Sequence, residues 1–173
     1  FDGVTSEQFS VALKDLQAKG MTGLVIDLRN NGGGSVKVVC EIADELLPEG
    51  MIVYTEYNDG RRVERNSDAE WVNLPMTVLI NGGSASASEI LCGALQDYGV
   101  ATIVGTQSYG KGIVQSVLDL QDGTALELTT AKYYTPNGNN IHGVRITPDV
   151  EIDLPDELKT VATRSPEEDV QLQ

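Results

Sequence analysis

The apolar residues of the first hundred positions follow two alternating patterns. Phe9, Leu13 and Leu16 recur at the spacing of one helix face, and the preceding Thr5-Ser6-Glu7-Gln8 has the form of a capping box. Short runs of continuous apolar residues come between the helical segments, which is typical of strands buried on both faces. The patterns predict helices over about residues 5–20 and 35–47 and one that ends near residue 98, and buried strands over residues 23–28, 76–80 and 101–105.

Two further segments have the alternation and the turn residues of β-hairpins. Residues 51–57 and 61–65 flank Asn58-Asp59-Gly60, and residues 113–118 and 124–130 flank Gln121-Asp122-Gly123. Helices that alternate with buried strands predict an α/β domain whose sheet is mostly parallel, with the hairpins added to it. The sequence after residue 135 is rich in Pro, Gly and Asn and is expected to form loops.

Composition narrows the classes of partner. The 173 residues suffice for one ordinary domain, and no apolar run approaches the ~20 residues that a membrane span needs. With 12 Lys and Arg against 26 Asp and Glu, the net charge of −14 disfavours binding to nucleic acid or to an anionic membrane surface. Cys40 and Cys92 fall in predicted helices without a metal-binding pattern, so we expect two small buried side chains, although the sequence does not exclude a disulfide.

Two glycine-rich segments each follow a predicted strand and precede a predicted helix. In Asn30-Asn31-Gly32-Gly33-Gly34, consecutive glycines allow N–H groups to converge on a developing oxyanion or a phosphate, although a tight turn alone also requires glycine. In residues 82–89, small residues around Ser84, Ser86 and Ser88 permit the sharp turn of a nucleophile elbow. Each of these serines could instead cap the helix, and spacing does not choose among them.

A third segment holds a lysine between two glycines, at the start of a predicted strand. On an extended chain Lys111, Ile113 and Gln115 point to the same side, so that Lys111 and Gln115 could share one cavity; an exposed loop lysine is the simpler alternative. The 173 residues contain one histidine, His142, in a predicted loop, so a Ser–His–Asp triad would depend on it. This scarcity of histidine favours lysine as a general base.

Four segments together resemble, in order and spacing, the core of the C-terminal processing and tail-specific proteases, which are serine proteases with a Ser–Lys pair. The segments are DLRNNGGG, NGGSASASEILCGALQDYG, VGTQSYGKGIVQ and IHGVRITPDVEID, and the resemblance extends from about Thr5 to Asp153. It implies a ClpP/crotonase-like core of stacked ββα units over residues 1–160, followed by a flexible acidic tail over residues 161–173. It also implies a location outside the cytoplasm, in the periplasm or cell envelope or secreted, and chemistry without a metal or cofactor.

Carried over residue by residue, the resemblance assigns the nucleophile to Ser86 and the general base to Lys111. It assigns to Gln115 the orientation of that lysine. Glu89 and Asp97 match family positions that are expected to support the shape of the site.

The resemblance assigns the oxyanion hole to backbone N–H groups of Ala87 and of the Gly32–Gly33 turn. Some relatives carry proline where Gly32 stands, and proline has no N–H, so Gly33 is the stronger candidate. Arg145 departs from the family pattern, because many relatives have glycine at this position.

The family normally carries a PDZ domain before this core, which receives the C-terminus of the substrate. The chain begins at Phe1 without Met, so we expect an excised fragment that lacks this domain. The implied partner is a protein or peptide that binds as an extended strand. Two alternatives remain open: a non-catalytic peptide-binding module on the same fold, and a crotonase-type acyl-thioester enzyme, which would need neither Ser86 nor Lys111.

Overall fold

The computed structural model describes residues 1–120, 122–156, 167 and 169–172. All the predicted helices and strands are present, and one further short strand follows the predicted loops. In chain order the elements are α1 (Thr5–Ala18), β1 (Leu24–Asp27), α2 (Val36–Asp44), β2 (Gly50–Tyr57), β3 (Arg62–Ser67), β4 (Met76–Ile80), α3 (Ala87–Asp97), β5 (Ala101–Gly105), β6 (Ile113–Asp119), β7 (Ala125–Tyr134) and β8 (Val150–Glu151).

The first sheet is parallel and has the strand order β1-β4-β5-β8. The central strand β4 is apolar on both faces, as the continuous run predicts. The edge strand β1 departs from the prediction: its residues alternate in burial, and Val25 is 55% exposed. The continuous apolar run of residues 23–28 therefore predicts the strand correctly, but the prediction that both of its faces are buried is wrong.

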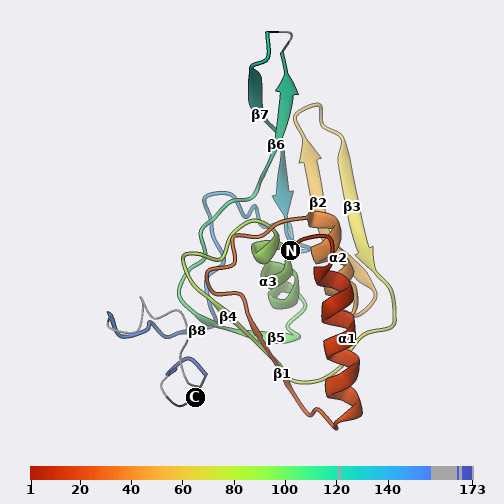
Figure 1. Ribbon diagram of the computed structural model, residues 1–173, viewed down its shortest axis with the longest axis vertical. Coiled ribbons are helices and arrows are strands. Elements are labelled where there is room, and N and C mark those ends of the chain that lie inside the picture. Colours follow the sequence, from red (N-terminus) through yellow and green to blue (C-terminus); the bar gives the residue numbers. More distant parts are fainter. Residues whose placement is uncertain (121, 157–166, 168, 173) are drawn as a thin grey trace.

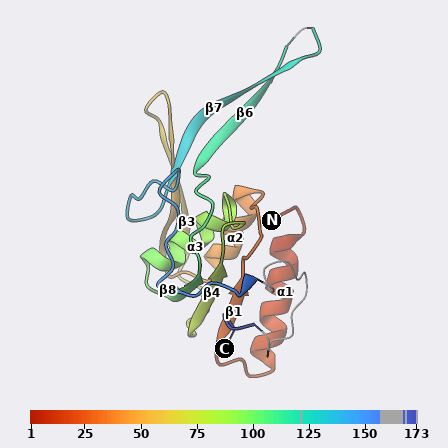
Figure 2. The ribbon, with the colours of Figure 1, turned by 90° about the vertical axis from the view of Figure 1, so that its left-hand side faces the viewer.

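The second sheet is antiparallel and has the order β3-β2-β7-β6. The two predicted hairpins form it, because β2 pairs with β7 and the rings of Tyr54 and Tyr134 stack with their centroids 4.8 Å apart. The expected α/β fold, with a parallel sheet and added hairpins, is confirmed, and the structure shows in addition that the two hairpins pair with each other. The far part of the β6–β7 hairpin extends beyond the body of the molecule (Figure 2).

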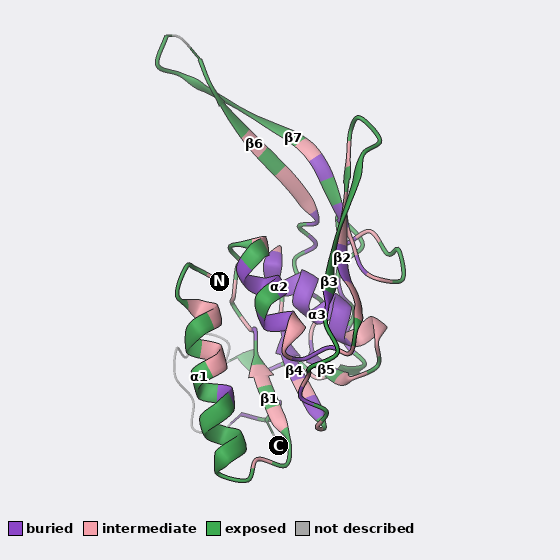
Figure 3. Ribbon diagram, turned by 90° about the vertical axis from the view of Figure 1, so that its right-hand side faces the viewer, coloured by how far each residue is buried: buried purple, intermediate pink, exposed green. Residues whose placement is uncertain are grey.

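The hydrophobic core lies between the two sheets, around α2 and α3 (Figure 1). Figure 3 shows that the buried residues gather in these two helices and in the strands beside them. The core includes Val78, Ile80 and Ile103 from the parallel sheet and Ile52 and Tyr133 from the antiparallel sheet. This packing fixes the position of the N-terminal end of α3, where the candidate nucleophile lies.

The start of α1 differs from the prediction. Val4 is the N-cap, and the Asp2 side chain accepts hydrogen bonds from the Val4 N–H at 3.2 Å and the Thr5 hydroxyl at 2.9 Å. The predicted capping box at Thr5 is therefore wrong. Leu13 is buried, but Leu16 is 42% exposed because the last turns of α1 extend past the core.

Both cysteines are buried and free, which confirms the expectation of two small core side chains. Burial raises the pKa of the Cys40 thiol to about 11 and raises the pKa of Cys92 as well. None of the helices in the described residues is long and apolar enough to cross a membrane.

The predicted flexible tail, residues 161–173, lies partly outside the described residues. In its described part, Asp169 and Gln171 are buried and contact Arg29, at the end of β1. Residues 169–172 thus lie beside the parallel sheet, and the expected flexibility of the tail as a whole stays a prediction.

Candidate active site

Ser86 lies at the turn between β4 and α3, in a conformation that serine rarely adopts. Its φ is 57° and its ψ is −115°, and its neighbours Ala85 and Ala87 are both buried. A non-glycine residue in this region is strained, and such strain is concentrated at functional sites. Among the described residues, the Ser86 hydroxyl donates no hydrogen bond. Its proton is therefore available to a base.

The two neighbouring serines are used structurally. Ser84 is buried, donates to the Leu28 carbonyl at 2.7 Å and accepts from the Asn81 N–H at 3.0 Å. Ser88 is fully buried and donates to the Asn31 carbonyl at 2.9 Å. The structure thus distinguishes the three serines that spacing leaves equivalent.

Gly33 packs directly against the Ser86 turn. A Cβ atom on Gly33 would lie 2.6 Å from the Ala85 oxygen and 2.8 Å from the Ala87 nitrogen, and its φ is +97°, so only glycine fits here. Gly32 is exposed and a Cβ on it would meet nothing within 4 Å. The Gly33 N–H donates to Asn31 Oδ1 at 2.9 Å, so a substrate oxygen would have to replace this contact.

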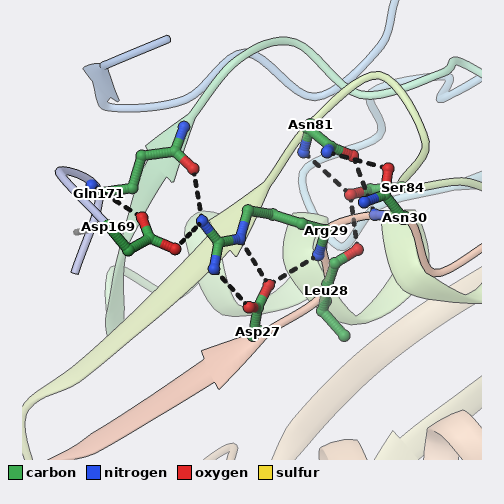
Figure 4. Close-up of polar contacts among 8 residues, drawn as sticks. All are labelled: Asp27, Leu28, Arg29, Asn30, Asn81, Ser84, Asp169 and Gln171. Carbon is green, nitrogen blue, oxygen red and sulfur yellow. Dashed lines mark hydrogen bonds and ion pairs between the residues drawn. The ribbon is translucent and has the colours of Figure 1, made fainter. Parts of the chain in front are cut away.

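The loops that carry Gly33 and Ser86 are joined by side-chain amides and by a backbone hydrogen bond. The Asn30 N–H donates to Asn81 Oδ1 at 2.9 Å, and Asn81 Nδ2 returns a bond to Asn30 Oδ1 at 3.1 Å (Figure 4). The Ala85 N–H also donates to the Asn31 carbonyl at 3.0 Å. Sequence analysis missed Asn81, although Asn30 and Asn81 each come shortly after adjacent parallel strands, whose carboxyl ends meet at one edge of the sheet.

Glu89 connects the Ser86 turn to residues 108–112 around Lys111, called here the lysine segment. Its side chain is buried, and one carboxylate oxygen, Oε2, accepts the N–H groups of both Ser86 and Lys111, each at 2.8 Å. The other oxygen accepts the Gly110 N–H at 2.6 Å and the Ser108 hydroxyl. Four charge-assisted hydrogen bonds on one buried carboxylate hold these two segments together. Ser108 is a further contributor that the sequence did not reveal.

The two glycines beside Lys111 are required by close backbone packing. A Cβ on Gly112 would lie 2.4 Å from the His142 nitrogen, and Gly110 has a φ of +90° and accepts the Gly143 N–H at 3.1 Å. Residues 141–145 thus lie against residues 110–112. This packing explains why glycine stands on either side of the lysine.

The side chains of Lys111 and Gln115 are both exposed. The register of the hairpin shifts between Val114 and Gln115, where Thr130 of β7 is the extra residue, so the alternation along β6 is not interrupted. The structure brings the Lys111 backbone to Ser86 through Glu89, and the roles of the Lys111 amine and of Gln115 stay predictions.

Asp97 and His142 lie away from this contact network. Asp97 is at the C-terminal end of α3, opposite to Ser86, and accepts the Asn137 N–H at 2.8 Å, so it supports the loop after β7. His142 is exposed, and its N–H donates to Asn140 Oδ1. Within the described residues, no group of three or more His, Cys, Asp or Glu could hold a metal ion.

An open cavity of about 430 Å³ lies beside the loops, at the carboxyl ends of the parallel strands. Asn30, Asn81 and Gly83 line it from the two loops, and Thr106 and Gln171 line it from the other side. Ligands commonly bind at this edge of an open α/β sheet.

Comparison with known proteins agrees with this arrangement. The model of peptidase family S41 matches residues 1–152. A carboxy-terminal-processing protease of Bartonella bacilliformis is 46% identical over 162 residues, which cover 90% of this chain and 37% of that protein. A chloroplastic C-terminal processing peptidase of Tetradesmus obliquus is 38% identical over 166 residues, covering 93% of this chain and 36% of that protein.

A solved structure of a photosystem II D1 C-terminal processing protease superposes with a TM-score of 0.83 at 38% identity, covering 92% of this chain and 42% of that one. The chain therefore spans little more than a third of the length of the curated relatives it matches. The matched residues include all the loops described above. On this evidence the chain belongs to peptidase family S41.

Proposed function

We propose that this chain carries the catalytic core of a C-terminal processing protease, a serine endopeptidase with Ser86 as nucleophile and Lys111 as general base. The observation that supports it most strongly is the difference among the three serines. Ser84 and Ser88 are buried and hold the neighbouring loop, whereas Ser86 sits in a strained turn and its hydroxyl donates to no other group in the described part of the chain. Gly33 and the first N–H of α3, on Ala87, flank it.

The chemistry follows from these positions. Lys111, when neutral, takes the proton of Ser86 as its Oγ attacks the scissile carbonyl, and the Gly33 and Ala87 N–H groups stabilise the oxyanion; losing one such donor typically costs about 3 kcal/mol. Lys111 then gives the proton to the leaving amine. Water hydrolyses the acyl-enzyme and regenerates Ser86.

One step must precede this reaction. Burial favours the neutral amine that a lysine base requires, and the Lys111 side chain is exposed. Bound substrate or another part of the full-length protein would have to cover it, with Gln115 orienting the amine. The proposed substrate is a protein or peptide bound as an extended strand and cleaved near its C-terminus, outside the cytoplasm or in an organelle lumen. A PDZ domain in the full-length protein would serve to capture it.

Ser86→Ala and Lys111→Ala test the proposal. An unstructured protein with an apolar C-terminus is incubated with each variant of the full-length protein, and its intact mass is followed. We expect cleavage by the unsubstituted protein and none by either variant, with unchanged circular dichroism. Near-full activity of either variant would remove that residue from the mechanism.

Two further measurements separate the alternatives. Covalent labelling of Ser86 by a fluorophosphonate supports a serine hydrolase, whereas binding of an acyl-CoA that survives Ser86→Ala would favour the crotonase-type enzyme. Peptide binding without cleavage or labelling would favour the non-catalytic module.

A further inference from the structure

Residues 169–172 dock on Arg29, which directly precedes the glycine-rich loop (Figure 4). Arg29 Nη1 donates to Asp169 Oδ2 at 2.7 Å and to Gln171 Oε1 at 2.8 Å. Arg29 Nε and Nη2 donate to the two carboxylate oxygens of Asp27. The side chains of Arg29 and Asp169 are only 7% and 2% exposed, so this ion pair has little access to water and depends on its partners.

The same short segment is also held at the opposite edge of the parallel sheet. Gln171 Nε2 donates to the carbonyl of Ile152, just after β8. Val170 and Leu172 face Val25 of β1 across a cavity of about 260 Å³. Because β1 and β8 are the two edge strands of this sheet, the segment connects one edge to the other.

The position of Arg29 sets the start of the loop that carries Gly33. The next residue, Asn30, has a φ of 59°, and its N–H is fixed by Asn81 Oδ1. The carbonyl of Asn31 is held by the Ala85 N–H and the Ser88 hydroxyl. A shift of Arg29 would therefore move a loop that contacts the Ser86 turn through Asn31, and Phe1 through Gly33, whose carbonyl accepts a hydrogen bond from the Phe1 nitrogen at 2.9 Å.

We infer that Asp169 and Gln171 are positioning residues: by holding Arg29, they fix the loop that presents Gly33 beside Ser86. The inference rests on the proposed function. It differs from a purely structural role, in which residues 169–172 only cover the sheet and any loss of their contacts would act through stability alone.

The test compares Asp169→Asn with Val170→Ala in the full-length protein. Asp169→Asn removes one of the two carboxylates that hold Arg29 and leaves Asp27 in place, whereas Val170→Ala changes a residue of the same segment that does not contact Arg29. We expect Asp169→Asn to lower kcat, and the rate of Ser86 labelling by a fluorophosphonate, by about tenfold or more, with KM little changed, since small displacements of catalytic groups have effects of this size. Val170→Ala should change both rates less than about twofold, even where it lowers Tm as much as Asp169→Asn does. It leaves the catalytic geometry in place.

Two more variants keep the test decisive. Asp169→Glu retains the charge and should recover most of the lost rate. If Asp169→Asn does not fold, Gln171→Ala removes one acceptor from Arg29 and leaves the ion pair, and it should give a smaller loss of the same kind. Equal rate losses for Asp169→Asn and Val170→Ala, or a rate for Asp169→Asn within twofold of the unsubstituted protein, would overturn the inference.

Amide hydrogen exchange of residues 30–34 gives a readout that does not need activity. It should become faster in Asp169→Asn and stay unchanged in Val170→Ala; unchanged exchange in both would contradict the positioning role. If cleavage and labelling do not depend on Ser86, the proposed function is wrong. The exchange measurement still tests whether Asp169 positions residues 30–34.

Discussion

The Ser86 turn and the lysine segment meet at Glu89 but are built differently. The Ser86 turn is fixed in both backbone and side chains, because Ser84, Ser88 and Asn81 tie it to the neighbouring loop. The lysine segment is fixed in its backbone only, and the Lys111 side chain is exposed. If Lys111 is the base, the nucleophile is preorganised and the base is not. Covering Lys111 is then the step at which substrate or another part of the protein can control activity.

Breaking the link between the two segments should have the largest effect. Glu89→Gln keeps the shape of the side chain but replaces an oxygen that accepts two hydrogen bonds by an NH₂ group that accepts none. We expect the free energy of unfolding to fall by about 2–4 kcal/mol, since hydrogen bonds to charged groups contribute about 1.5–3 kcal/mol each. Urea denaturation measures the stability, and cleavage and Ser86 labelling should both be lost.

Glu127→Gln, on the exposed part of β7, is the matched control and should leave stability and labelling unchanged. A Glu89→Gln variant as stable and as readily labelled as the unsubstituted protein would show that the carboxylate is not the connection between the two segments.

Gly112→Ala tests the lysine segment separately. The added Cβ would lie 2.4 Å from the His142 nitrogen and 2.7 Å from the Ile141 Cβ, so the segment must move away from residues 141–142. Overpacking of this kind typically costs about 1–3 kcal/mol. We expect cleavage and fluorophosphonate labelling both to fall, because both need Lys111 to take the Ser86 proton, while amide exchange of the Ser86 turn stays unchanged. Gly3→Ala, with open space around its Cβ, is the control; faster amide exchange of the Ser86 turn in Gly112→Ala would mean that the two segments are not independent.

The sequence predicts the elements of this fold well because the signals for them are local. Helical spacing and apolar runs locate β4, α3 and β5, and turn residues locate both hairpins. The pairing of β2 with β7 joins segments that are far apart in the chain. The spacing of apolar residues within each segment does not predict which strands pair. The docking of Asp169 on Arg29 is missed for the same reason.

In the candidate site, too, the sequence predicts the local features and not those that depend on contacts between distant segments. Glycine and small residues at two strand-to-helix junctions point to Gly33 and to the serine cluster. Which serine is free depends on burial by the neighbouring loop, which is a tertiary property. The expected meeting of Lys111 with Gln115 stays a prediction, because both residues are exposed and the register shift of this hairpin adds a residue to β7 and not to β6.

Ser84→Ala should separate stability from chemistry in the Ser86 turn. Removing the hydroxyl takes one of two donors from the Leu28 carbonyl, which keeps the Asn31 N–H, and it removes the acceptor of the Asn81 N–H; a hydrogen bond of this kind contributes about 0.5–1.5 kcal/mol. We expect a lower Tm with cleavage retained at temperatures where the variant is folded. Ser116→Ala, which removes a hydroxyl contact on the β6–β7 hairpin, should change Tm little. Loss of cleavage in a fully folded Ser84→Ala variant would reopen the choice of nucleophile.

The smallest effect is expected at Arg145, whose φ of 69° explains why glycine suits this position. Arg145→Gly removes the strain of a left-handed residue, which is about 1–2 kcal/mol, but glycine also loses more chain entropy on folding, by about 0.5–1 kcal/mol. The Arg145 side chain also packs over Gly110, so its loss removes a contact of the lysine segment.

Arg145→Ala keeps the Cβ at the same φ and removes the rest of the side chain, so the comparison of the Ala variant with the Gly variant isolates the contribution of the backbone. A Gly variant more stable than the Ala variant by up to about 1 kcal/mol in urea denaturation would give the cost of the positive φ minus the entropy that glycine loses on folding. The same measurement at Ser86, with its φ of 57°, would remove the proposed nucleophile, whereas Arg145 allows backbone strain to be measured with the Ser86 hydroxyl left in place.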